Sequence, residues 1–438
     1  ANEPMDPTDA IFLMLIALIV MVILGIHIGL ALGTTSIVGT YLLFDSAEMA
    51  AAQVGSAAFF VLRDYVFAVI PLFVLMGEFV SKSGSAGDLY KTMNHGMKRV
   101  PGRLAVATVA GNAVFAAVTG TSLASAATFS RLAYPEMIAA NYKRTFALGS
   151  VAGSASLGML IPPSVLMIIW GIVTEISIGN LFVAGIIPGL ILALLMALYS
   201  MGHAILDPTV APRVDMAKEE PLTRDEMVSG LGVIVLIFIV LGGLFAGWFT
   251  PQESAAVGAI GGLILAIIKG VRWHGIRESI IDSGKVIAPI MFLLLTAQMY
   301  SRLLASGGVI SIISDTITHS GLDHNTIIFF MIIMWLVLGT LLDSGSIILL
   351  TVPIFWPVVQ LFGFNEYAFA ILGILAIEAG LLTPPVGLLV YAVKGAVEDK
   401  TVTLLEIFKG SIPYWILMLI VMCMIWAYPP ISSWLTTV

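Results

Sequence analysis

Long apolar runs recur along the chain from Ile11 almost to the C-terminus, and charged residues gather in the short intervals between them. A membrane-spanning helix needs about 20 largely apolar residues, and stretches of about that length recur here. The acidic segment 1–9 precedes the first run and lacks the basic region and small-residue cleavage site of a signal peptide. The pattern predicts an all-α polytopic protein of the lipid membrane with a retained first span.

Two double-proline sites indicate that this pattern is repeated. Segment 160–164 reads Leu-Ile-Pro-Pro-Ser, and segment 382–386 reads Leu-Thr-Pro-Pro-Val, 222 positions later. One register across the chain predicts two homologous halves. The same offset relates Pro135 to Pro357, Gly25 to Gly247, Gly39 to Gly261 and the cluster 120–122 to 342–344.

Each predicted half has three spans, a segment broken by small polar residues, a span broken at Pro-Pro and a closing span. The predicted ranges are 11–31, 33–44, 65–81, 105–140, 145–176 and 181–205, then 228–247, 253–268, 286–304, 325–361, 366–396 and 411–428. Residues 46–64 suit an interfacial helix or a linking arm, and 206–227 suits a linker between the halves. The stripe Gly25, Gly29 and Gly33 predicts close helix contact, within the chain or with a separate membrane subunit.

The polar-tipped segments determine the expected topology. If each is a re-entrant hairpin, each half crosses the membrane five times, so the halves are inverted repeats. With the N-terminus outside, 17 of the 20 basic residues fall in loops predicted inside, as the positive-inside rule requires. Both termini are then expected outside, the first hairpin opens to the cytoplasm and the second opens to the outside.

Composition narrows the functional class. Hydrophobic residues make up 59% of the chain and charged residues 11%, against about 25% charged residues in soluble domains. The net charge of −7 offers no basic surface for nucleic acid. The chain has no phosphate-loop, HExxH or GxSxG motif, so ATP-driven transport and familiar hydrolase chemistry are disfavoured and we do not expect an enzyme.

The interruptions are the candidate binding sites. Proline lacks an N–H and frees an upstream carbonyl, and freed carbonyls with hydroxyls form an oxygen shell suited to Na⁺. The alternative is that these prolines and small residues serve only helix packing. The first candidate Na⁺ site comprises Gly120, Thr121, Ser122, Ser125, Gly158, Leu160 and Pro162, and the second comprises Asp343, Ser344, Gly345, Ser346, Gly380, Leu382, Thr383 and Pro384.

Two acids and one base in predicted membrane segments are further candidates. A charge at membrane depth costs at least ~2.5 kcal/mol and usually has a partner or a function. Glu378 either contributes to ion binding or holds the broken helix by a hydrogen bond, and Asp343 lies at a polar tip. Arg131 either pairs with a substrate carboxylate or lies against a polar cavity. The candidate substrate-binding residues are Arg131, Ser122, Ser346 and Glu378.

Five motifs resemble the large membrane subunit of tripartite ATP-independent periplasmic (TRAP) transporters. The resemblance spans nearly the whole chain, and the run Gly-Leu-Leu-Thr-Pro-Pro-Val-Gly is specific. One departure is the second tip, which has Ser-Gly-Ser after Asp343 where Pro and then Thr or Ala are expected. The motifs are Ile-Pro-Leu-Phe at 70–73 and the segments 160–164, 183–189, 249–258 and 378–387.

The resemblance implies Na⁺-coupled uptake of an organic acid across the bacterial inner membrane, with no cofactor besides the coupling ion. It implies two partners, a small membrane subunit and a periplasmic substrate-binding protein. Sialic acid, C4-dicarboxylates, keto acids and compatible solutes all remain open as substrates. A stand-alone Na⁺/dicarboxylate carrier and a cation/proton antiporter are the alternatives.

The resemblance also implies an elevator fold, with Na⁺ sites between each hairpin tip and the facing Pro-Pro break. The termini are then periplasmic, and the linker is cytoplasmic. The implied division is scaffold spans and arm in 1–64, transport elements of the first half in 65–205, the linker 206–227, scaffold spans of the second half in 228–285 and its transport elements in 286–438.

Overall fold

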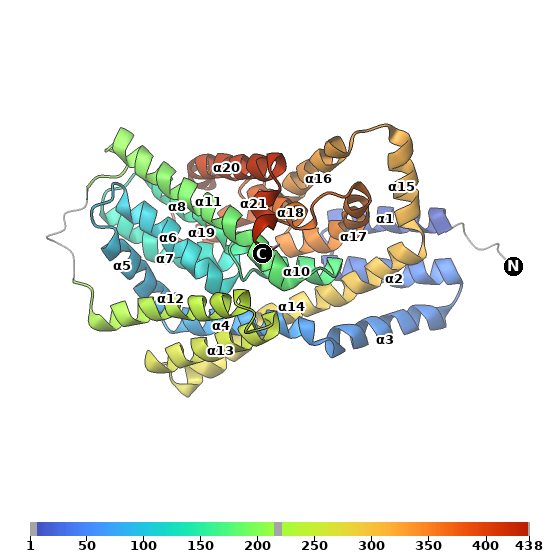
Figure 1. Cartoon of the computed structure of the whole chain (residues 1–438), viewed down its shortest axis with the longest axis horizontal. Coiled ribbons are helices and arrows are strands. Elements are labelled where there is room, and N and C mark those ends of the chain that lie inside the picture. The colour runs from blue at the N-terminus through green and yellow to red at the C-terminus, as the bar shows by residue number, and fades with distance from the viewer. Residues whose placement is uncertain (1–6, 214–220, 437–438) are drawn as a thin grey trace.

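The computed structural model describes residues 7–213 and 221–436. Over these residues the chain is helical throughout, with no strand (Figure 1). Eight of the described helical segments are long and apolar enough to cross a membrane, and α1, α2, α6 and α16 are shorter apolar helices. The predicted all-α polytopic fold is confirmed.

The helices of the first half follow the predicted order. The predicted hairpin 105–140 is the pair α6–α7, and the predicted broken helix 145–176 is α8–α10. The bounds are α1 Pro7–Ile23, α2 Ile28–Phe44, α3 Ala47–Arg63, η1 Tyr65–Ala68, α4 Val69–Lys82, α5 Ser85–Gly96, α6 Arg103–Thr119, α7 Ser122–Ala139, α8 Arg144–Ala155, α9 Leu157–Leu160, α10 Val165–Thr174 and α11 Ile178–Leu206.

The second half repeats this order at the predicted offset. Its hairpin is α16–α17 and its broken helix is α18–α19, and the peptide bond within each proline pair is cis. The bounds are α12 Arg224–Phe245, α13 Pro251–Ile268, α14 Trp273–Ser306, α15 Val309–Ser320, α16 His324–Gly339, α17 Ser344–Phe362, α18 Glu366–Leu381, α19 Leu388–Ala396, α20 Leu404–Ala427, α21 Pro430–Ser433 and η3 Trp434–Thr436.

Some predicted boundaries were wrong for local reasons. The first span does not run to residue 31, because Gly25 adopts a φ of 78° and separates α1 from α2. The predicted span 286–304 begins earlier, at Trp273, since the charged first turns of α14 are helical. Helices α5 and α15 lie in segments predicted as loops, and both are amphipathic rather than uniformly apolar.

The two halves exchange packing partners. Helix α2 packs on α14 of the other half, and α13 packs on α4. A Cβ at Gly29 would lie 2.7 Å from Phe292 Cε1, and one at Gly33 would lie 3.1 Å from Thr296 Cγ2. Gly29 and Gly33 therefore serve close contact within the chain, the first of the two alternatives, whereas Gly25 lies before α2 and a Cβ there would meet no atom within 4 Å. Helices α10 and α19 likewise pack on the hairpin helices α17 and α7 of the opposite half.

Helix α3 lies along α14. Gln53 Nε2 donates to Met299 O over 2.9 Å, and Thr40 of α2 donates to Gln53 Oε1. Residues 46–64, expected as an interfacial helix or linking arm, thus pack on α2 and α14. The expected division at 64/65 falls between α3 and η1, whereas the division at 285/286 falls within α14.

Ion pairs join α5 to helices of the second half. Lys269, the C-cap of α13, contacts Asp88 over 2.7 Å, and Lys91 contacts Glu226 at the start of α12 over 2.6 Å. A capping box formed by Thr223 and Glu226 begins α12, so the same carboxylate also fixes that helix end.

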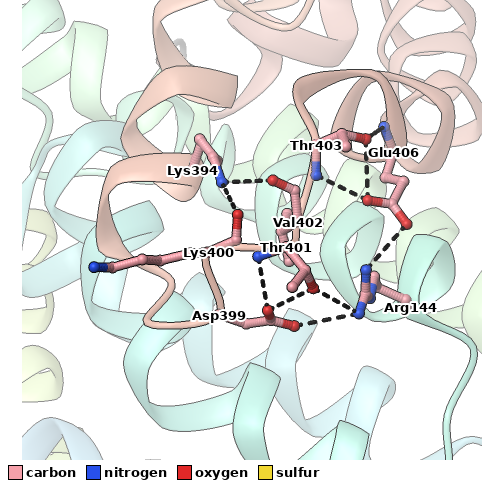
Figure 2. A network of polar contacts seen from close by, with 8 residues as sticks. All are labelled: Arg144, Lys394, Asp399, Lys400, Thr401, Val402, Thr403 and Glu406. Atoms are coloured by element: carbon pink, nitrogen blue, oxygen red, sulfur yellow. Dashed lines mark hydrogen bonds and ion pairs between the residues drawn. The ribbon is translucent and has the colours of Figure 1, made fainter.

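A polar network joins α8 to the connection between α19 and α20 (Figure 2). The Arg144 guanidinium contacts Asp399 over 3.3 Å, Glu406 over 3.5 Å and the Thr401 hydroxyl over 3.0 Å. Hydrogen bonds from Thr401, together with the Arg144 charge, hold the pKa of Asp399 below its usual value. Lys394 of α19 donates to the carbonyls of Lys400 and Val402 in the same connection.

Candidate functional site

The two hairpins approach the centre from opposite ends of the long axis (Figure 1). In the first, α6 ends at Gly120, whose φ of 62° turns the chain, and Thr121 is extended before α7 begins. Glycine is favoured here because a left-handed residue commonly ends a helix. Gly120 O accepts a hydrogen bond from Val165 N over 3.1 Å, so this tip is joined directly to the first residue of α10.

The first Pro-Pro break packs tightly against this tip. A Cβ added at Gly158 would lie 2.7 Å from Thr121 O and 2.8 Å from Ser122 N. Ser164, after the two prolines, donates to Met159 O over 2.6 Å and caps α10 by accepting from Met167 N. Sequence analysis did not select Ser164, although a serine just before an apolar helix is an N-cap signal.

The structure brings the first candidate set together. Gly120, Ser122, Ser125, Gly158, Leu160 and Pro162 are all buried, and only Thr121 is half-buried. Ser122 Oγ and Ser125 Oγ are buried with no hydrogen-bond partner among the described residues. Buried hydroxyls without partners are uncommon in native structures and point to a further group at this position.

The second tip has a different arrangement. Asp343 is exposed and is the N-cap of α17, accepting a hydrogen bond from Ser346 N over 3.0 Å. A carboxylate at this position satisfies an otherwise unpaired N–H and complements the helix dipole. Ser344 and Ser346 are buried beside it, whereas Gly345 is half-buried.

The second Pro-Pro break contacts its hairpin at the end of α16, before the polar tip. A Cβ added at Gly380 would lie 2.6 Å from Gly339 Cα, at the end of α16, rather than against the start of α17. Thr383 Oγ1 donates to Ala379 O over 2.8 Å, and Leu382 is buried. Pro384 and its partner proline are exposed, whereas both prolines of the first break are buried.

Glu378 lies between the two tips and is 1% exposed. Its Oε1 accepts a hydrogen bond from Ser344 Oγ over 2.9 Å. Ser122 of the first tip lies close to this carboxyl group. Glu378 Oε2 and Ser122 Oγ are both buried, and neither has a hydrogen-bond partner among the described residues. Helix α18 of the second half thus places one carboxyl group beside both tips.

Comparison with known proteins identifies the family. Residues 15–431 match the family described as "Tripartite ATP-independent periplasmic transporter, DctM component". The C4-dicarboxylate TRAP transporter large permease protein DctM of Pseudomonas aeruginosa is 31% identical over 84% of this chain and 85% of its own length. The chain belongs to the TRAP large permease family.

Other relatives carry different substrate names. The sialic acid TRAP transporter large permease protein SiaM of Vibrio cholerae is 26% identical over 84% of this chain and 85% of its own length. The ectoine TRAP transporter large permease protein TeaC of Halomonas elongata is 25% identical over 97% of this chain and 98% of its own length. These relatives are transporter permeases rather than enzymes.

A solved structure supports the fold of the permease. The YdaH transporter of Alcanivorax borkumensis superposes with a TM-score of 0.67 at 14% identity, covering 91% of this chain and 90% of that chain. At this identity the likeness concerns the fold alone. The permease is a multi-pass helical membrane protein of that architecture.

Arg131 is not brought to the tips of the permease. It lies nine residues after Ser122 on α7, about 13 Å along the helix axis. Its side chain is exposed, and none of the ion pairs of the described residues includes it. The carboxylate-binding role expected of Arg131 therefore has no support from its position.

Among the described residues, no cluster of three or more His, Cys, Asp or Glu side chains could hold a metal ion. The oxygens at the two tips are hydroxyls, backbone carbonyls and single carboxylates. Such oxygen ligands suit hard cations, whereas thiolate and imidazole ligands suit softer metals such as zinc and copper.

A cavity of about 470 Å³ lies away from both tips. Its lining combines the end of α3 and η1, the turn between α10 and α11, and the start of α13. Asp64 and Glu175 are its acidic residues, and Ser177 and Gln252 add neutral polar groups. It separates helices expected in the scaffold from the broken helix of the first half.

Proposed function

We propose that this permease catalyses Na⁺-coupled secondary uptake of an organic acid across the bacterial inner membrane by an elevator mechanism. A periplasmic binding protein delivers the substrate, and a small membrane subunit completes the transporter. The two matched pairs of hairpin tip and Pro-Pro break, related by one offset of 222 residues, carry this proposal.

The proposed Na⁺ sites are the two sets of oxygens described above. At the first, the unpartnered hydroxyls of Ser122 and Ser125 face a break that frees backbone carbonyls. At the second, Ser344 and Ser346 offer hydroxyls on the same tip as the carboxylate of Asp343, and Thr383 offers a hydroxyl at the facing break. Each Na⁺ that enters down a potential of 100 mV supplies about 2.3 kcal/mol.

An organic acid is the proposed substrate class. Three relatives are named for C4-dicarboxylates, sialic acid and ectoine, all of which carry a carboxylate. Helices α7 and α17 begin at the two polar tips, and helix N-termini favour anions. Ser122 and Ser346 are the proposed tip residues nearest such a substrate.

The proposed moving part combines both hairpins with both broken helices. Packing of α10 on α17 and of α19 on α7 interlocks these elements across the halves, and Arg144 joins α8 to the connection before α20. The proposed scaffold is the second interlocked set, α2 with α14 and α13 with α4. It therefore takes in α4 and the part of α14 after residue 285, which the expected division placed with the transport elements. The cavity beside Asp64 lies between the two sets, where sliding would occur.

Uptake by proteoliposomes that contain the permease and its small subunit tests the proposal. Candidate acids are offered with an imposed Na⁺ gradient, with and without the cognate binding protein. We expect uptake to require both Na⁺ and the binding protein. Uptake without the binding protein would favour a stand-alone carrier, and Na⁺-driven proton efflux indifferent to organic acids would favour an antiporter.

A further inference from the structure

Glu378 breaks the repeat at the centre of the molecule. The position 222 residues earlier is Ser156, whose hydroxyl donates to Gly153 O within its own segment over 2.7 Å. Glu378 instead accepts a hydrogen bond from Ser344 of the second tip and lies close to Ser122 of the first. One half therefore supplies a carboxyl group that has no counterpart in the other half.

The surroundings of Glu378 suit a carboxylate that holds two helix ends. Ser122 is the first residue of α7 and Ser344 the first of α17, and helix N-termini carry a positive partial charge. None of the ion pairs formed by the described residues includes Glu378. The two helix ends are therefore the groups at hand that offset its charge.

The two tips are attached to this carboxyl group unequally. The second tip is fixed, because Ser344 donates to Oε1 and Asp343 caps α17. The first tip is joined to α10 but is not bonded to Glu378, because Ser122 Oγ and Glu378 Oε2 lack hydrogen-bond partners. A carboxyl group is planar, so a shift of Ser344 that turns Oε1 also moves Oε2 relative to Ser122.

We propose that Glu378 is a positioning residue that couples the two hairpin tips, so that cation binding at one tip changes the cation affinity of the other. This inference rests on the proposed function, which places one Na⁺ at each tip. Cation binding at the second tip shifts Ser344 and, through its hydrogen bond, turns the carboxyl group so that Oε2 comes within reach of Ser122. Binding at the second tip therefore strengthens binding at the first.

Chemical labelling at the first tip tests this coupling. Leu123 is 41% exposed beside Ser122, and Cys423→Ser removes the native thiol. We would titrate Na⁺ against choline and follow maleimide labelling of the Leu123→Cys variant in the assembled transporter. Ser346→Ala, at the second tip, should raise the Na⁺ concentration that half-protects the first tip by about fivefold or more.

The same titration in variants of Glu378 shows whether this residue carries the coupling between the tips. In Glu378→Ala protein, Ser346→Ala should no longer move the midpoint at the first tip. Glu378→Gln should retain part of the coupling, because the amide can still accept from Ser344 and donate to Ser122. If Glu378→Ala does not fold, a partial loss of coupling in Glu378→Gln provides the same comparison.

The outcomes separate this inference from the proposed function. If Na⁺ gives no protection with Glu378 intact, both fail. If Na⁺ protects but Ser346→Ala shifts the midpoint equally with and without Glu378, or does not shift it at all, the Na⁺ sites stand and the coupling role is overturned. Glu366→Gln, at the far end of the same helix, is the matched control and should keep the full shift.

Discussion

The two pairs of tip and break share one register but differ in their packing. At the first, the tip carbonyl of Gly120 bonds to the start of α10, and both prolines are buried. At the second, Gly380 packs one turn before the tip, and Asp343 and both prolines are exposed. An internal repeat therefore does not impose equal structure, and we interpret the first pair as closed and the second as open in this conformation.

Gly158→Ala should have the largest effect on this comparison. The added methyl would press on the backbone of Thr121, which cannot move aside as a side chain can, and overpacking costs about 1–3 kcal/mol. We expect uptake to fall by about tenfold or more. Gly395→Ala, in α19, is the control, because a Cβ there would meet no atom within 4 Å. Equal uptake by the two variants would contradict a closed first site.

Labelling at matched positions tests the difference in exposure. Ser164 and Val386 are related by the repeat, and Ser164 is fully buried whereas Val386 is half-buried. With Cys423→Ser as background, Val386→Cys should react with a membrane-impermeant maleimide about tenfold faster than Ser164→Cys, because labelling of a buried site requires local opening. Similar rates would show that the two breaks are equally accessible in the membrane.

Loss of single hydroxyls should have a smaller effect. Ser122→Ala removes an oxygen with no other partner, so the Na⁺ concentration for half-maximal uptake should rise by about fivefold, corresponding to ~1 kcal/mol. Thr383→Ala should raise it less, because that hydroxyl already bonds to Ala379 O. Unchanged Na⁺ dependence in both variants would exclude these side chains as ligands.

The smallest effect is expected from substitutions at the N-terminal ends of the two broken helices, where α8 and α18 begin. Arg144 has Glu366 as its counterpart, and there the link to the other half is a hydrogen bond from Asn180 Nδ2 to Tyr367 Oη over 3.2 Å. Arg144→Ala should lower the free energy of unfolding by ~1 kcal/mol, since its ion pairs are partly exposed. Tyr367→Phe should lower it by less. Thermal unfolding at low and high salt should show salt sensitivity that Arg144→Ala reduces.

The sequence predicted the repeat, both hairpins and both broken helices, because proline pairs and small polar tips act through local backbone chemistry. It did not predict α5 and α15, whose amphipathic patterns are short and interrupt the apolar residues with polar ones. Nor could it place Ser122 beside Glu378, since that contact depends on how two distant hairpins meet. The exposure of Asp343 was not predicted for the same reason. The composition of a hairpin tip does not show how far the facing Pro-Pro break lies from that tip.

The exchange of partners between α2 and α14 and between α4 and α13 has a consequence for biogenesis. When the ribosome has made only the first half, the small-residue face of α2 has no Phe292 or Thr296 to receive it. Nascent α2 and α4 must then stay in the lipid bilayer with those faces uncovered until translation reaches the second half. Helices α2 and α4 therefore complete their packing only when α14 and α13 have been inserted.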